Sequence, residues 1–459
     1  MTKKSLLRLL IFASGIGCSS QTNGSTPTTG GGGSLGAAGR PNAAGTAGAV
    51  GAIAGAGGLG SSGALGTGGA PSNGGAGAGG GGMSGIAGGS SGGAAAGAGS
   101  GSAGASTGGA TGGSAGGASD APVDTKKMVS AMGFGTNIGN TLENTAAWET
   151  GWGQPLITQA YINGMASRGI KTVRVPVAWD TYASNGVIDP TKMARVKEVV
   201  GWIDAAGMYS LVNIHWDGGW IDNDTDNNPN RYQLSADVKS KFASYWTQIA
   251  TAFSTVGHRL ILEGLNEESK FYLNGDTSKP DYAALNTLNQ LFVTTVRAQA
   301  GYSKTRALLI AGFTTDIALT CVSSFSIPND PAGAGKLFLS LHYYTPYTFC
   351  GLDSVESWGS PQTTWGTTAD KSELDRLFTQ LATCSTDKNV PVILGEFAVT
   401  PGDKYPRDPA SRTAWMTAVG KACFARKIVP LLWDTGSEIS RTDGSFATTF
   451  KSVIKDSGY

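Results

Sequence analysis

A low-complexity tract near the start of the chain constrains the fold more than any other feature. From Gln21 to Ala121 the sequence is almost entirely Gly, Ala, Ser and Thr, and it holds most of the 70 glycines among the 459 residues. Without aromatic side chains or a hydrophobic period, it has too little apolar surface to offset the entropy of ordering. A Gly/Ser-rich coil of this length spans roughly 50 to 60 Å end to end. We therefore predict a disordered linker over residues 19–122.

The segment before the linker has the organisation of an export signal. Lys3, Lys4 and Arg8 precede the apolar run from Leu9 to Phe12, and small residues lead to Cys18. The sequence GIGC at 15–18 resembles a bacterial lipoprotein cleavage box, which implies a lipid on Cys18 and firm membrane anchoring; an ordinary signal peptide is the alternative. We predict a signal peptide over residues 1–18 and an exported protein, which is either a lipoprotein of the cell surface or outer membrane or is secreted.

The composition changes abruptly at Val123, and all 11 Trp and all three His lie beyond it. Short β-rich runs alternate there with longer stretches of helical period, for example Val196, Val199 and Ile203. The expected strands are Phe134–Asn137, Thr172–Val175, Tyr209–His215, Leu260–Leu265, Ala307–Ala311, Phe338–His342, Val392–Gly395 and Val429–Leu432. Eight βα repeats favour a closed (β/α)8 TIM barrel over residues 123–459. An open doubly wound sheet is the alternative, although no GxGxxG or Walker motif supports its nucleotide-binding form.

Charge and cysteine content limit the partners. The formal net charge is +1 and the basic residues form no stripe, so nucleic acid is not expected as a partner. Four cysteines in an exported domain, Cys321, Cys350, Cys384 and Cys423, allow two disulfides in three connectivities, or buried free thiols. No Cys/His cluster indicates zinc, and a run with Asp222, Asp224 and Asp226 is expected to be a solvated turn rather than a calcium site. We expect a monomer without metal or organic cofactor.

Polar and aromatic side chains gather at the carboxyl ends of the expected strands, where barrel enzymes build their active sites. Two are glutamates, Glu267 after the fourth strand and Glu396 after the seventh. Retaining glycosidases hold two carboxyl groups about 5 to 5.5 Å apart, one to attack the anomeric carbon and one to protonate the leaving oxygen. We predict Glu396 as the nucleophile and Glu267 as the acid/base, which the neighbouring like charge keeps protonated.

Seven motifs resemble those of glycoside hydrolase family 5 and follow one another along the whole domain. They are GFGTNIGNTLE at 133–143, TVRVP at 172–176, NIHWD at 213–217, LEGLNE at 262–267, LHYY at 341–344, ILGEF at 393–397 and LLWD at 431–434. Besides the two glutamates, the catalytic residues that the resemblance implies are Arg174, His215, Asn266, His342 and Tyr344. Many members carry a second His where this chain has Trp216, which forms either a subsite wall or part of the core.

Substrate contacts are expected from a further set of strand-end and loop residues. These are Asn137, Asn140, Trp216, Asp217, Trp220 and Trp433, the last of which the resemblance implies as a sugar-stacking ring. For Trp148, Trp152 and Trp220, loop packing is as plausible as sugar stacking. We expect a structural role for His258, a position in solvent or in a side-chain network for Glu268, and for Glu143 a role in shaping the first loop or a distal subsite.

The resemblance implies an endo-acting cellulase that cleaves β-1,4-glucosidic bonds of cellulose or related β-glucans. Mannan, xyloglucan, mixed-linkage glucan and xylan are alternative substrates, because selectivity lies in loop residues. A non-catalytic surface protein that binds carbohydrate is the alternative from another class; the intact set of catalytic residues argues against it.

Overall fold

A computed structural model describes residues 123–222, 234–273 and 276–459 of the chain. The predicted signal peptide and linker, together with Cys18, Asp224 and Asp226, lie outside these residues. No helix within the described ranges combines the length and the apolar character that crossing a bilayer requires.

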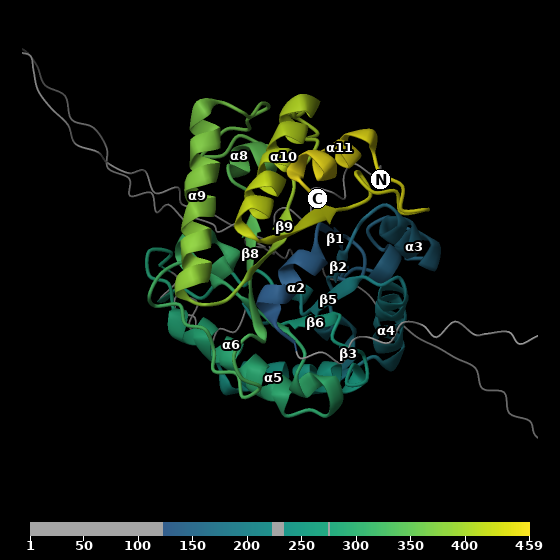
Figure 1. Cartoon of the computed structure of the whole chain (residues 1–459). Helices are drawn as coiled ribbons and strands as arrows, with labels where there is room; N and C mark the ends of the chain where they lie inside the picture. The colour runs from purple at the N-terminus through teal and green to yellow at the C-terminus, as the bar shows by residue number, and fades with distance from the viewer. Residues whose placement is uncertain (1–122, 223–233, 274–275) are drawn as a thin grey trace, which may run out of the picture. The chain divides into compact units, whose positions relative to one another are not determined.

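Eight parallel strands close into a barrel, which confirms the predicted (β/α)8 fold (Figure 1). They are β1 (Gly135–Ile138), β2 (Thr172–Val175), β5 (Tyr209–Asn213), β6 (Leu260–Glu263), β7 (Leu308–Ala311), β8 (Leu337–Tyr343), β9 (Val392–Phe397) and β10 (Val429–Asp434). Neighbouring strands follow the chain order, and β1 pairs with both β2 and β10 to complete the ring. Each predicted strand is present, and its ends lie within two residues of the prediction.

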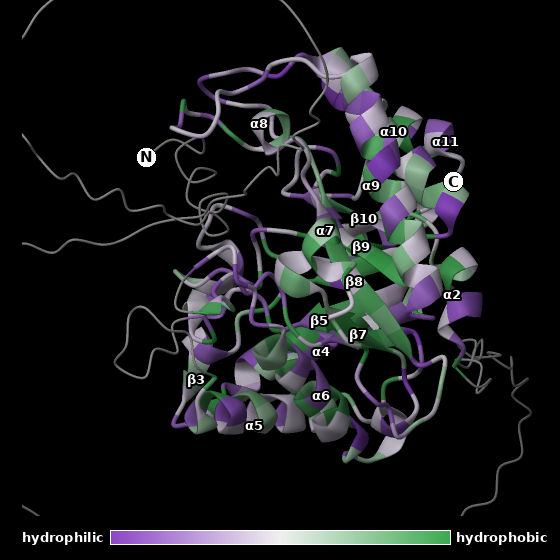
Figure 2. Ribbon diagram, turned by 90° about the vertical axis from the view of Figure 1, so that its left-hand side faces the viewer, coloured by the Kyte–Doolittle hydropathy of each residue, from purple (hydrophilic) through white to green (hydrophobic). Residues whose placement is uncertain are grey.

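Helices surround the barrel and turn an apolar face toward it. The longer ones are α3 (Gln159–Ser167), α4 (Pro190–Ala205), α5 (Ala236–Ala252), α6 (Tyr282–Arg297), α9 (Thr368–Asp387), α10 (Pro409–Arg426) and α11 (Thr448–Ser457). The residues that predicted α4 are all buried against the strands. Figure 2 shows strands such as β7, β8 and β9 in the green of apolar residues, whereas the helices mix both colours.

Local sequence sets where the helices begin. Asp189 caps α4 and Asp408 caps α10, each followed by a proline at the first helical position, which suits the fixed φ of proline. At α9, Thr367 and Asp370 form a reciprocal capping box. These starts fix the lengths of the loops at the carboxyl ends of the strands, where the site lies.

The remaining elements are short apart from α2, which has eight residues. They are α2 (Thr125–Met132), α7 (Ile317–Thr320), α8 (Tyr347–Cys350), the 3-10 turns at Trp148–Thr150, Asp180–Tyr182, Asp217–Gly219, Gly301–Lys304 and Phe313–Thr315, and a hairpin of β3 (Ala183–Ser184) with β4 (Val187–Ile188). Helix α2 lies in the middle of the ring of helices in Figure 1. It covers the amino-terminal end of the barrel, where Thr172 donates a hydrogen bond to the Met132 carbonyl.

The cysteines of the described residues form no disulfide. Cys350 and Cys423 are buried as free thiols, and Cys321 and Cys384 lie close enough for a hydrogen bond between their thiols. Of the two arrangements that the sequence left open, the structure has the free thiols.

Candidate active site

Arg174 organises the buried centre of the site. It points inward from β2, and its Nε lies 2.6 Å from Glu263 Oε2 while its Nη1 lies 2.7 Å from Glu396 Oε1. Its remaining hydrogens reach the side-chain oxygens of Asn266 at 2.8 Å and Asn137 at 3.1 Å. Burial alone would lower the pKa of Arg174, but the charges of Glu263 and then Glu396 raise it. The guanidinium is therefore a fixed cation that holds four side chains in register.

Glu263 is a site residue that the sequence prediction missed. It is fully buried on β6, where it accepts two hydrogen bonds from Arg174 and one of 2.8 Å from the Ser340 hydroxyl. A lone carboxylate inside the strand Leu-Ile-Leu-Glu was the available signal, since acidic residues are almost never fully buried unless they are paired. Glu263 supports the site from below, because its carboxylate orients the arginine that holds Glu396.

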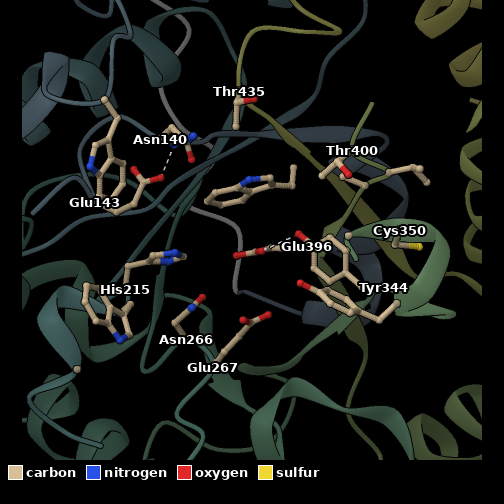
Figure 3. Close-up of a pocket in the computed structure, with 18 of the residues that line it drawn as sticks. Asn140, Glu143, His215, Asn266, Glu267, Tyr344, Cys350, Glu396, Thr400 and Thr435 are labelled. Atoms are coloured by element: carbon tan, nitrogen blue, oxygen red, sulfur yellow. Dashed lines mark hydrogen bonds between the residues drawn. The ribbon is translucent and has the colours of Figure 1, made fainter. Parts of the chain in front are cut away.

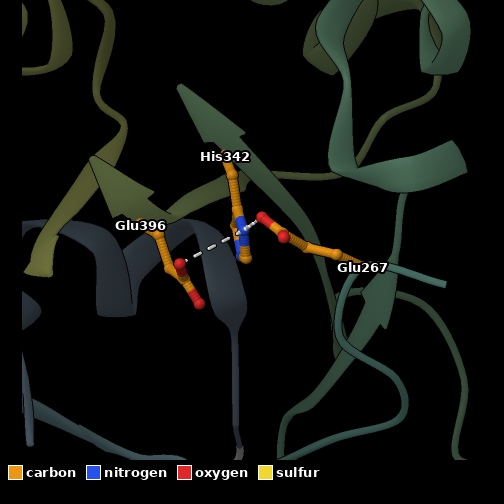
Figure 4. A group of neighbouring side chains, drawn as sticks. All are labelled: Glu267, His342 and Glu396. Atoms are coloured by element: carbon orange, nitrogen blue, oxygen red, sulfur yellow. Dashed lines mark hydrogen bonds and ion pairs between the residues drawn. The ribbon is translucent and has the colours of Figure 1, made fainter. Parts of the chain in front are cut away.

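Glu267 and Glu396 face each other across the barrel mouth (Figure 4). A carboxylate oxygen of one lies within 4.8 Å of a carboxylate oxygen of the other, and a ring nitrogen of His342 lies within the same distance of both. Glu396 also accepts a 2.9 Å hydrogen bond from the Tyr344 hydroxyl, beside the bond from Arg174. The two carboxyl groups thus have different surroundings: Glu396 has two donors that favour its ionised form, whereas Glu267 contacts an imidazole.

Protonation differs between the two glutamates and their histidine. Burial raises the pKa of Glu267 to about 7, with Arg174 opposing the rise. Burial also raises the pKa of Glu396, and its interactions with His342 and with the Arg174 guanidinium act against the rise. Since burial lowers the pKa of His342 to about 4, its contact with Glu267 through Nδ1 is a hydrogen bond to a neutral ring rather than an ion pair.

His215 and Trp433 form one wall of the site. Their rings stack with centroids 5.7 Å apart and planes 7° from parallel. Burial lowers the pKa of His215 well below its ordinary value, so the ring is neutral, and its Nδ1 lies 3.2 Å from the Asn213 amide nitrogen. The stack fixes the orientation of the Trp433 indole, which lines the pocket.

These side chains lie in a pocket at the carboxyl end of the barrel (Figure 3). It encloses about 1290 Å³ of space, the open solvent at its mouth included. Among the predicted site residues, it is lined by Asn140, His215, Trp216, Asn266, Glu267, Tyr344, Glu396 and Trp433.

Three of the expected substrate contacts do not line this pocket. Asn137 lies inside the barrel, where its amide donates to the Gly395 carbonyl and its oxygen accepts from Arg174. Asp217 turns toward the loop after β2 and accepts hydrogen bonds from the backbone of Trp179 and Thr181. Trp220 packs edge to face on Tyr245. The positions of Asn137 and Asp217 correct the prediction, because both side chains are buried and order neighbouring groups. A substrate contact of Trp220, which is partly buried, stays a prediction.

Other lining residues were not expected at the substrate surface. Glu268 was predicted to be a solvent or network residue, and it lines the pocket, as does Asp222. Of the three loop tryptophans only Trp152 lines it, because Trp148 packs on Tyr182. Tyr347 and Cys350 also line the pocket and were not predicted. Glu143, for which a distal subsite was one of two predicted roles, lines it as well.

The group of Glu267, His342 and Glu396 also has the donors that a metal ion would need. An ion there would coordinate both carboxylates that face the pocket. The same donors suit general acid/base and nucleophilic work without an ion.

A (β/α)8 barrel with two glutamates facing each other at its carboxyl end defines the class: the chain is a glycoside hydrolase. The comparison with family models gives the family. Residues 129–438 match the model described as cellulase, glycosyl hydrolase family 5. The chain belongs to this family, as the motifs indicated.

Relatives and solved structures agree with the family. Endoglucanase A of Paenibacillus barcinonensis is 31% identical over 342 residues, which cover 68% of this chain and 82% of the relative. A xyloglucan-specific endo-β-1,4-glucanase of Bacteroides ovatus is 31% identical over 336 residues, covering 68% of this chain and 64% of the relative. A solved broad-specificity endoglucanase from an uncultured bovine rumen ciliate superposes with a TM-score of 0.64 at 31% identity, covering 73% of this chain and 98% of that one.

Proposed function

We propose that this chain is a retaining endo-β-1,4-glucanase that cleaves internal bonds of cellulose or related β-glucans. The observation that carries the mechanism is the approach of the Glu267 and Glu396 carboxylate oxygens to within 4.8 Å. Retaining enzymes place their carboxyl groups about 5 to 5.5 Å apart, whereas inverting enzymes need about 6.5 to 9.5 Å to admit a water. The similarity to endoglucanases supports the endo action on β-glucan.

In the first step, the Glu396 carboxylate attacks the anomeric carbon as the glycosidic C–O bond breaks. Glu267 gives its proton to the leaving oxygen, so the departing chain ends in a hydroxyl group and the retained sugar is bound as an ester of Glu396. Arg174 and Tyr344 hold the attacking carboxylate by hydrogen bonds of 2.7 and 2.9 Å. Fixing the nucleophile in this way lowers the entropic part of the barrier.

In the second step, the Glu267 carboxylate takes a proton from water, whose oxygen attacks the anomeric carbon and releases Glu396. Esterification of Glu396 removes a negative charge near Glu267, which lowers the pKa of Glu267 when it must act as a base. Each step inverts the anomeric centre, so the product keeps the β configuration.

The substrate panel is the first test of this proposal. The fragment from Val123 to Tyr459 is assayed beside the full-length chain on carboxymethyl-cellulose, mixed-linkage glucan, xyloglucan, mannan and xylan, with the product anomer followed by proton NMR. We expect β-product from cellulosic substrates. Cleavage of xyloglucan or mannan alone would replace the substrate class, α-product would reject the retaining mechanism, and binding without turnover on every polymer would favour a carbohydrate-binding protein.

Export and anchoring remain proposals that rest on residues 1–18. We propose that Cys18 carries lipid and that the monomeric catalytic domain works outside the cytoplasm, attached to the cell surface or outer membrane. Cys18→Ser should move the protein from the membrane fraction to the soluble fraction if this proposal holds. Analytical ultracentrifugation of the fragment tests the monomer.

A further inference from the structure

Trp358 is an exposed indole beside the catalytic pocket. It is 42% exposed, and it lies on the loop between α8 and α9, after the carboxyl end of β8. Leaving so large an aromatic surface in water forgoes a considerable gain from burial. The reaction steps above do not use it.

The loop holds Trp358 in a defined position. Glu356 and Gly359 exchange backbone hydrogen bonds of 2.9 and 3.2 Å, so Trp358 sits within a tight four-residue turn. Gln362 ties the loop to α8 through its backbone N–H, which donates to the Thr348 carbonyl at 2.8 Å, and through its side chain, which accepts from the Thr348 hydroxyl at 3.0 Å. The backbone that carries Trp358 is therefore fixed before any ligand arrives, which reduces the entropic cost of binding.

Tyr347 connects this indole to the catalytic pocket. Its ring lies 6.3 Å from that of Trp358, centroid to centroid, with the planes 38° apart, and Tyr347 itself lines the pocket. It opens α8 directly after β8, the strand whose His342 contacts Glu267. Consistent with this position, burial and then the charge of Glu267 raise the pKa of Tyr347. The two rings therefore extend the pocket from the side of the group that protonates the leaving oxygen.

We propose that Trp358 forms a distal subsite that stacks on a glucosyl unit of the leaving-group part of the polysaccharide. This inference rests on the proposed function, since it takes Glu267 as the acid. Equatorial substituents give a β-linked glucosyl ring two flat faces of C–H groups, which pack on an indole as apolar surface does. Because Tyr347 connects Trp358 to the pocket, the ligand at Trp358 is the same glucan chain that the two carboxyl groups cleave.

The experiment compares Trp358→Ala with wild type on two substrates. Cellohexaose, labelled at its reducing end, is long enough to occupy the distal subsite, whereas 4-nitrophenyl cellobioside has a small leaving group that ends before it. We expect Trp358→Ala to raise KM for cellohexaose about three- to tenfold, as for loss of one aromatic contact. Cleavage should also shift toward bonds that leave fewer glucosyl units on the reducing-end side. The kcat/KM for the cellobioside should stay unchanged.

Two further variants control the result. Trp358→Phe keeps an aromatic face and should restore most of the affinity for cellohexaose. Val355→Ala removes exposed apolar surface from the same loop without removing a ring, and it should leave both substrates unaffected. Circular dichroism verifies that each variant is folded.

The outcomes separate this inference from the function on which it rests. If wild type cleaves neither substrate, the proposed function fails. If wild type cleaves both but Trp358→Ala keeps the wild-type KM and cleavage pattern on cellohexaose, only the distal subsite is rejected. An equal loss on both substrates also rejects it, because the indole would then support the catalytic centre. Failure of Trp358→Phe to restore affinity would show that stacking is not the cause.

Discussion

The two ends of the barrel interior contrast in chemistry although the same strands build both. The floor is an apolar cluster from six strands and α2: Met132, Leu211, Ile261, Leu309, Phe338, Ile393, Val429 and Leu431, with Val123 and Ala307 beside them. Gly135 belongs to this level, because a Cβ there would lie 2.4 Å from a Leu431 methyl group. Two or three residues further along three of these strands, the interior holds Glu263, Ser340 and Glu396 instead, and Arg174 reaches them from β2.

The floor of the barrel therefore serves mainly stability, and the mouth serves mainly function. The floor contributes by removing apolar surface from water, whereas buried ion pairs rarely add net stability, since desolvation offsets much of the attraction. The charges at the mouth are therefore best understood as fixing the geometry and ionisation of Glu396. Changes at the mouth should reduce activity whether or not they reduce stability, whereas changes at the floor should reduce stability and leave activity nearly unchanged.

The largest expected effect is removal of either facing carboxylate. Glu396→Ala and Glu267→Ala should each reduce kcat on polymer by roughly a thousandfold or more, because a covalent step or a proton transfer is lost. On 2,4-dinitrophenyl cellobioside, which needs no acid, added azide distinguishes the roles. Glu396→Ala should yield the α-glycosyl azide by a single displacement, and Glu267→Ala should yield the β-glycosyl azide by trapping the ester. NMR of the products tests the assignment, and exchanged outcomes would reverse the two roles.

The second largest effect is expected for Arg174, the cation that pairs with both Glu263 and Glu396. Arg174→Met keeps an unbranched apolar stem but leaves Glu263 and Glu396 buried without their shared partner. Breaking a buried ion pair costs about 3 to 5 kcal/mol of unfolding free energy, and we expect kcat to fall by about a hundredfold or more. Adding Glu263→Gln to this variant should recover part of the stability but not the activity. Urea unfolding monitored beside kcat tests this, and recovery of activity would show that Glu263, not Glu396, is the important partner.

At the floor, Phe338→Ala should lower the free energy of unfolding but leave activity nearly unchanged. Phe338 is fully buried, and truncation of a buried phenylalanine costs about 3 to 5 kcal/mol. Well below the melting temperature, kcat and KM should stay within about twofold of wild type, because the cavity lies below the Arg174 level. Ile393→Val is the milder control, at about 1 kcal/mol. A large loss of kcat in a folded Phe338→Ala variant would contradict the separation of the two ends.

The two ends also differ in how well the sequence predicts them. The strands could be located because buried parallel strands form continuous apolar runs, and the facing glutamates because both follow such runs directly. The hairpin of β3 and β4 was missed, although Asn185-Gly186 between its strands is a strong turn signal and both residues have positive φ.

The errors at the mouth arise from side-chain direction, which a sequence does not contain. Asn137 ends an expected strand but points into the barrel rather than into the pocket. Asp217 follows β5 with a positive φ, which turns its carboxylate toward the loop after β2. Tyr347 opens α8, and Trp358 lies on the following loop, whose path depends on hydrogen bonds to α8 and to the loop after β9. Such contacts between distant segments decide which loop residues reach the substrate.

A change of pH should alter kcat/KM less than the substitutions at the mouth do. Because burial raises the pKa of Glu267 to about 7, its acid form should be present below that value and lost as the pH rises through it. The plot of log kcat/KM on cellohexaose against pH should therefore fall on the alkaline side near pH 7. On 2,4-dinitrophenyl cellobioside this limb should disappear, since the leaving group needs no proton. Persistence of the limb would assign it to another group.

The smallest effect is expected for Thr315, whose substitution tests the ionisation of Glu267. The Thr315 side chain hydrogen-bonds Glu267 and thereby lowers the pKa of that carboxyl group against the effect of burial. Thr315→Val keeps the shape but removes the hydroxyl, so the pKa of Glu267 and the alkaline limb should rise by a few tenths of a pH unit. This is the scale of one neutral hydrogen bond, about 0.5 to 1 kcal/mol, shared between the two protonation states.

Thr400→Val is the matched control for this variant. Thr400 lines the same pocket, and its buried hydroxyl has no hydrogen-bond partner within the described part of the chain. Its replacement should leave the limb in place. A downward shift in Thr315→Val would mean that the hydroxyl stabilises the protonated acid, and an equal shift in both variants would trace the effect to the polarity of the pocket. A rise of the alkaline limb in Thr315→Val alone would show that the Thr315 hydroxyl, in the loop after β7, lowers the pKa of Glu267 in addition to the effect of Arg174.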